Sequence, residues 1–230
     1  VFKGDYNKAR SYYQQYYDNA FNINQKFAAL WWKAVTYVYE NNISESIKIL
    51  DERSKLASEN NAPNYVINGN AFAGLILIEN GNLAEGEKYF NNASDFTKSF
   101  DMDYATQMIY EIYNDLDNCH LKILKKDFDG AEKDLEVIKA QVETRQVPNE
   151  IKYLNLIYGI LQYNKGNFGL ALDYISKADK ESPYTWYWEA ISQERAGNTQ
   201  EAKKIFEKIA SSNINSMELA IVRNKALMKL

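Results

Sequence analysis

Residues 183–206 of the chain read "PYTWYWEAISQERAGNTQEAKKIF". Gly197 stands where a helix has to end, because glycine tolerates the left-handed backbone found at helix C-termini. Ala202 and Phe206 follow this turn at a spacing that puts both on one face of a second helix. Ala190 precedes the turn by seven residues and offers a small side chain for close helix contact. The stretch therefore predicts a helical hairpin.

The same offsets recur along the chain. Segments 79–93, 125–138, 164–178 and 195–209 align on their turns, and each carries a small residue followed four positions later by a large apolar one. These pairs are Gly86 and Phe90, Ala131 and Leu135, Ala171 and Ile175, and Ala202 and Phe206. The helices before the turns carry small residues of their own: Ala34, Gly74, Cys119, Gly159 and Ala190. Self-similarity of this kind predicts stacked helical repeats.

This pattern resembles the tetratricopeptide repeat (TPR) family, best in units 152–183 and 183–210. The resemblance implies an all-α fold, a right-handed α-solenoid of antiparallel helix hairpins. It covers nearly the whole chain, so we expect a single domain over residues 1–230. This domain would comprise a half repeat at 1–22, five hairpins at 23–213 and a C-terminal capping helix at 214–230. The alternative is a generic helical bundle whose spacings agree by chance.

The hydrophobic periodicity and the turns predict twelve helices. Their expected ranges are 5–18, 24–40, 44–60, 66–80, 83–100, 103–125, 128–145, 149–165, 168–180, 184–196, 199–211 and 216–229. The last helix suits a cap, because Leu219, Val222, Ala226 and Leu230 form an apolar stripe. Turn-to-turn distances vary around the family period of ~34 residues, which predicts an irregular superhelix.

The family resemblance implies a protein-interaction scaffold whose first helices line a concave groove. By the small-residue register, Trp186 lies in the core and Trp188 on a flank. The expected partner contacts are the tyrosines of this wall: Tyr113, Tyr153, Tyr163, Tyr184 and Tyr187. Other groove positions are Trp31, Val35, Asn68, Ala71, Leu116, Leu156, Ile191 and Glu194. Tyrosine is favoured at interfaces, but these rings could equally pack against adjacent helices.

One TPR subclass clamps the acidic C-terminal tails of chaperones with Lys and Asn at fixed groove positions. Here those positions hold Ala28, Trp32, Phe72, Tyr113, Asp117 and Tyr153. We therefore do not predict chaperone-tail binding. An extended or helical peptide with apolar anchors, from a protein partner of unknown identity, suits the groove better.

The first predicted helix carries a continuous aromatic stripe that includes Tyr12, Tyr13, Tyr16 and Tyr17. This helix matches only the second half of a repeat. We expect that the chain is a fragment of a longer protein, or that a second copy covers the stripe in a homodimer. The alternative is that helix 24–40 covers it alone. The second functional hypothesis follows: a helical accessory or self-association region of a larger regulatory or envelope-associated protein.

The composition and motifs argue against other functions. The net charge of -4, with acids and bases mixed, does not favour nucleic-acid binding. The longest apolar run, Ala71 to Ile78, is far shorter than the ~20 residues of a membrane span. A single cysteine, Cys119, leaves the compartment open, with the cytoplasm slightly favoured over the periplasm.

Catalytic and metal-binding patterns are weak. Cys119 and His120 are adjacent, so on a helix their side chains diverge by ~100°. One His and one Cys do not make a zinc site of the usual kind. Residues 126–136 have EF-hand spacings, but Lys125 takes the first ligand position, which should be acidic. We expect a non-catalytic protein that needs no cofactor or metal.

Overall fold

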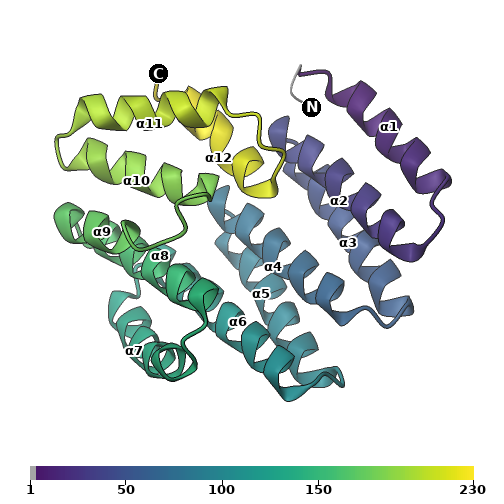
Figure 1. Ribbon diagram of the computed structural model, residues 1–230, viewed down its shortest axis with the longest axis horizontal. Helices are drawn as coiled ribbons and strands as arrows, with labels where there is room; N and C mark the ends of the chain where they lie inside the picture. Colours follow the sequence, from purple (N-terminus) through teal and green to yellow (C-terminus); the bar gives the residue numbers. More distant parts are fainter. Residues whose placement is uncertain (1–3) are drawn as a thin grey trace. The chain divides into compact units, whose positions relative to one another are not determined.

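The computed structural model describes residues 4–230, which contain twelve helices and no strand (Figure 1). The helices are α1 (Tyr6–Asp18), α2 (Ile23–Tyr39), α3 (Ile43–Glu59), α4 (Pro63–Glu79), α5 (Leu83–Ser99), α6 (Tyr104–Leu124), α7 (Phe128–Arg145), α8 (Pro148–Asn164), α9 (Phe168–Ile175), α10 (Pro183–Arg195), α11 (Thr199–Ser211) and α12 (Met217–Leu227). The all-helical prediction is confirmed. In this part of the chain, none of the helices combines the length and the apolar composition needed to cross a bilayer.

The helices pack neighbour to neighbour, as in a helical solenoid. The hairpins pair α2 with α3, α4 with α5, α6 with α7, α8 with α9, and α10 with α11. The first helices α6, α8 and α10 also contact one another in sequence order, and α1 packs against α2. Helices α1 to α11 thus pack mainly on their neighbours in the chain, which is the packing expected of stacked repeats.

The chain divides into two compact units. The first contains the residues up to Met102 together with Asn213–Ile221, and the second contains Asp103–Ser212 together with Val222–Leu230. Residues of α12 belong to both units. The expectation that residues 1–230 act as a single domain stays a prediction.

All the predicted turns share one backbone conformation. The turn residues have positive φ angles: Gly4 76°, Asn41 57°, Gly81 81°, Lys126 66°, Gly166 85° and Gly197 90°. In the last five of these turns, the next N–H donates to the carbonyl five residues earlier, as Asn82 does to Leu77. This bond is the signature of the Schellman motif, which satisfies carbonyls at the end of a helix. The repeat alignment therefore located real helix ends.

The small residues of the repeat let paired helices approach closely. A Cβ atom added at Gly74 would lie 2.5 Å from the Phe90 ring, and one added at Gly159 would lie 2.5 Å from Cγ1 of Ile175. Because Phe90 and Ile175 are buried, neither can move into solvent. The small side chain before the turn and the large apolar one after it are thus complementary halves of one contact.

Two predicted details were wrong. The helix expected over 168–180 ends at Ile175, where bonds from Lys177 to Tyr174 and from Ala178 to Ile175 tighten the chain into i to i−3 turns before Pro183. Leu230 does not join the apolar stripe of the last helix, because α12 ends at Leu227 and Leu230 is 53% exposed. Leu219, Val222 and Ala226 are buried as predicted.

The close contact in the α8–α9 hairpin gives a matched test. Gly159→Ala should lower the free energy of unfolding by about 1–2 kcal/mol, because overpacking outweighs the higher helix propensity of alanine. Gly169→Ala, in the same hairpin, should raise it by about 0.5–1 kcal/mol, since no atom lies within 4 Å of the added methyl. Urea unfolding measures both. Equal stabilisation by the two substitutions would show that the helices do not approach closely at Gly159.

Candidate functional site

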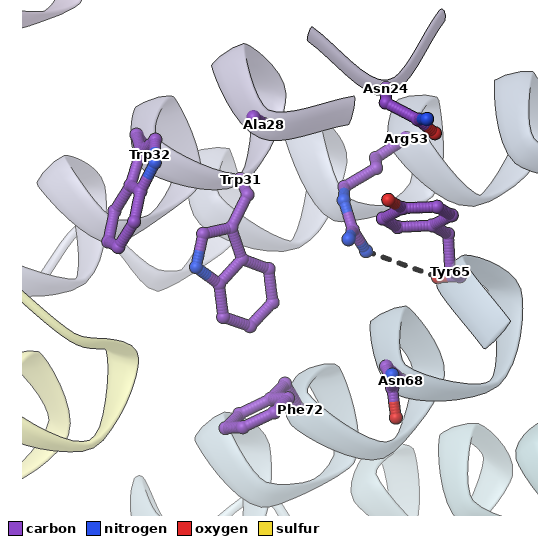
Figure 2. A pocket seen from close by; sticks show the side chains of 8 residues that line it. All are labelled: Asn24, Ala28, Trp31, Trp32, Arg53, Tyr65, Asn68 and Phe72. Atoms are coloured by element: carbon purple, nitrogen blue, oxygen red, sulfur yellow. Dashed lines mark hydrogen bonds between the residues drawn. The ribbon is translucent and has the colours of Figure 1, made fainter. Parts of the chain in front are cut away.

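A hollow of about 370 Å³ lies in the first unit, between the first helices α2 and α4 (Figure 2). Its volume is at the lower end of the ~300–1,000 Å³ range typical of ligand sites. The hollow is lined from α2 by Asn24, Ala28, Trp31 and Trp32, from α3 by Arg53, and from α4 by Tyr65, Asn68 and Phe72. It therefore combines an aromatic wall with two amides and one cation.

Helical spacing and caps bring the wall together. Asn22 caps α2 by accepting the Gln25 N–H at 3.0 Å, which fixes the start of this helix. Pro63 starts α4, where a missing N–H costs nothing. Facing residues of α2 and α4 then meet: the rings of Trp31 and Phe72 pack edge to face with centroids 5.0 Å apart. The aromatic wall is thus held by contacts between α2 and α4.

Arg53 links three helices at one side of the hollow. It comes from α3, and its Nε donates to the Phe27 carbonyl of α2 at 3.2 Å. Its Nη1 donates to the Tyr65 carbonyl of α4 at 3.1 Å, the bond drawn in Figure 2. The guanidinium also lies over the rings of Trp31 and Tyr65, at 5.1 and 4.8 Å from their centroids. Its position is therefore fixed by both hydrogen bonds and cation–π contacts.

Arg53 is a buried cation that no described carboxylate neutralises. Its side chain belongs to the core, with 6% of the residue exposed. Burial lowers the pKa of Arg53 to about 10, and Tyr65 opposes this change. The group remains charged at neutral pH. Burying a charge without a counter-ion is costly, so the carbonyls and rings around Arg53 offset only part of that cost.

The sequence register found part of this hollow. Trp31 and Asn68 were expected groove positions, and the structure places both on its lining. Arg53 was missed because it belongs to a second helix. A signal was present: Ser46, Ile49, Leu50, Arg53 and Ala57 form the buried stripe of α3. A charged residue inside such a stripe must find partners within the fold or in a ligand.

Several expected groove positions are core positions instead. Val35, Leu116, Leu156 and Ile191 are all buried. The register placed them on the same face as the exposed Asn68, but neighbouring helices cover them. This part of the groove prediction was wrong, because exposure depends on how far each adjacent helix extends over that face.

Two of the predicted contact tyrosines meet in the second unit. Tyr113 of α6 and Tyr153 of α8 are half-buried, with ring centroids 5.7 Å apart. The Tyr153 hydroxyl donates to the buried carboxyl of Asp117. Burial raises the pKa of Asp117 to about 7, and the bond from Tyr153 reduces this rise. The hydroxyl of Tyr153 is therefore engaged within the chain.

The other three tyrosines gather around Trp188 of α10. The rings of Tyr163, Tyr184 and Tyr187 lie 5.5, 6.3 and 6.4 Å from the Trp188 ring, centroid to centroid. Tyr184 is 4% exposed, whereas Tyr163 and Tyr187 are half-buried. Trp186 lies in the core as expected, with Nε1 donating to the Lys180 carbonyl at 2.6 Å. A role for these tyrosines in partner binding stays a prediction, and Tyr184 has little surface for it.

The residues of the weak catalytic and calcium-like patterns lie on α6 and at the start of α7. Burial raises the pKa of Cys119 to about 12, so this thiol is protonated at neutral pH and is a poor nucleophile. His120 is buried near the rings of Tyr184 and Trp188. Asp127, in the EF-hand-like segment, caps α7 by accepting the Gly130 N–H at 3.0 Å.

The aromatic stripe of α1 is only partly covered. Tyr13 and Tyr17 are half-buried, whereas Tyr12 is 58% exposed and Tyr16 is 42% exposed. Phe21, just after the helix, is 95% exposed. Helix α2 therefore covers one side of this stripe, and the other side remains open in the described chain.

The buried carboxyl of Asp117 predicts a pH dependence. Its pKa is raised on folding, so the native state binds a proton that the unfolded chain releases between about pH 4 and pH 7. Stability must therefore fall as pH rises through this range, and level off above it. Asp117→Asn should abolish this component, as measured by urea unfolding from pH 4 to pH 8. Asp173→Asn, at an exposed position of α9, is the control, because it shows how stability changes when one exposed carboxyl is removed. Parallel pH profiles for wild type and Asp117→Asn would contradict the prediction.

Comparison with known proteins agrees with the geometry. A family model described as "Tetratricopeptide repeat" matches residues 184–213, which span α10 and α11. A search of curated proteins found no match. The matched hairpin contains Ala190, Gly197, Ala202 and Phe206, and the helices before it are paired in the same way. The chain is therefore a TPR-like helical repeat protein.

Proposed function

We propose that this protein is a non-catalytic scaffold that holds a segment of a protein partner in the hollow between α2 and α4. The TPR match supports a protein-interaction role in general. The observation that carries the finer proposal is the composition of the lining: Trp31, Trp32 and Phe72 offer apolar and aromatic surface, and Asn24 and Asn68 offer amides. A few polar groups among aromatic side chains are typical of sites that orient a bound chain.

The hollow suits a peptide segment better than a folded domain. Its volume of about 370 Å³ accommodates a small number of side chains. Large aromatic residues in such positions usually dominate binding energy, with truncations costing ~2 kcal/mol or more. The tyrosines Tyr113, Tyr153, Tyr163 and Tyr187 of the second unit remain candidates for additional contacts.

A blocking substitution tests this proposal. Short random peptides displayed on phage are selected on wild type, and their affinities are measured by fluorescence anisotropy. Asn68→Trp fills the hollow from an exposed position and should weaken binding by about tenfold or more. Asn91→Trp, an exposed asparagine on α5 of the same hairpin, should leave affinity unchanged.

The same peptides distinguish the two surfaces. Peptides that bind Asn68→Trp and wild type with equal affinity are then measured on a Tyr153→Glu, Tyr187→Glu double variant. If they lose affinity for this variant, the binding site is the surface around these tyrosines and not the hollow. Circular dichroism establishes that each variant is folded before binding is compared.

Self-association through α1 is a second candidate function, favoured by the exposure of Tyr12, Tyr16 and Phe21. Contiguous exposed aromatic surface often marks an interface. If two copies meet there, sedimentation equilibrium should show a dimer that Tyr12→Ser with Tyr16→Ser converts to monomer. A wild-type chain that stays monomeric at high concentration would contradict this candidate.

A further inference from the structure

We propose that the hollow receives an acidic side chain, Asp or Glu, from an extended segment of the partner, and that Arg53 binds its carboxylate. This inference rests on the proposed function, because it specifies the chemistry of the segment that the hollow would hold.

The charge of the hollow favours an acidic ligand. Of the eight residues that line it, Arg53 is the charged one. Its guanidinium has five N–H donors, and the structure assigns one to the Phe27 carbonyl and one to the Tyr65 carbonyl. Neither acceptor carries a charge. Within residues 4–230, Arg53 forms no ion pair, so a ligand carboxylate would supply the missing counter-ion.

A carboxylate fits this cation better than the other acceptors that a protein offers. A main-chain carbonyl could accept a hydrogen bond from Arg53 but would leave the buried charge uncompensated. A phosphate carries ≈ −1.5 to −2 charge, which a single guanidinium cannot neutralise. One carboxylate balances one guanidinium and can accept two of its N–H groups side by side.

Arg53 is also pre-organised for this role. Its carbonyl acceptors lie on α2 and α4, and its planar head lies over the rings of Trp31 and Tyr65. Gly69 of α4 lies beside this head, since a Cβ there would be in ordinary van der Waals contact with Nη1, at 3.6 Å. A fixed guanidinium loses little entropy when it binds, which strengthens the interaction.

The side chains around Arg53 indicate which type of residue should lie beside the acidic residue in the bound segment. Trp31, Trp32 and Phe72 line the same hollow and are partly exposed. A large apolar side chain close to the acidic residue can pack on them. The recognised sequence is therefore an acidic residue near an aromatic or branched aliphatic one, within an extended segment and not at a chain terminus.

The experiment uses short random peptides displayed between two constant domains, so that they present no free terminus. Selection on wild type should enrich Asp or Glu near Trp, Phe, Leu or Ile. Enriched peptides are then synthesised with both ends blocked, alongside versions in which the acid is replaced by its amide. The replacement should weaken binding to wild type by about tenfold or more, the usual value of a hydrogen bond to a charged group.

Arg53→Gln should remove this difference between acid and amide peptides while leaving a weaker apolar interaction. If that variant does not fold, the acid-to-amide comparison on wild type decides alone. Peptides that lose affinity for Asn68→Trp but bind equally as acid or amide would overturn the inference and leave the proposed function intact. Peptides indifferent to Asn68→Trp would contradict the proposed function itself. Binding only by peptides with a free C-terminal carboxylate would also overturn the choice of a side chain.

Discussion

The structure depends on the close approach of paired helices at their small residues. At Gly74, Gly86 and Gly159 there is no space for even a methyl group, because the partner helix places Phe90, Ile78 or Ile175 against the backbone. Dense packing of this kind stabilises a hairpin by burying large apolar side chains completely. It also sets the distance between the paired helices.

In the α2–α3 and α4–α5 hairpins, part of the face of each first helix remains accessible. On α2 and α4 this face becomes the hollow, whose aromatic wall is held by the edge-to-face contact of Trp31 and Phe72. The second helix α3 contributes to it as well, because Arg53 is long enough to reach the carbonyls of both α2 and α4. The Arg53 side chain therefore links three helices and also lines the hollow.

The aromatic residues near the start of α10 have different roles. Trp186 is buried and bonded to the backbone before α10, whereas Trp188 is the centre around which Tyr163, Tyr184 and Tyr187 gather. These rings hold α8 and α10 together. Tyr163, Tyr184 and Tyr187 are therefore engaged in packing within and between these first helices.

The local structure of each hairpin could be predicted from the amino-acid spacings alone. Helix lengths, the turn positions and the small-to-large contacts follow from spacings within a hairpin, and even Lys126 adopts the left-handed backbone that its place in the repeat requires. Which residues line a surface became clear from the packing of the helices. Val35 and Asn68 occupy related groove positions, yet one is buried and the other exposed. The position of Arg53 at the hollow likewise depends on the packing of α2, α3 and α4. Burial depends on contacts between residues far apart in the chain, and the repeat spacing does not encode those contacts.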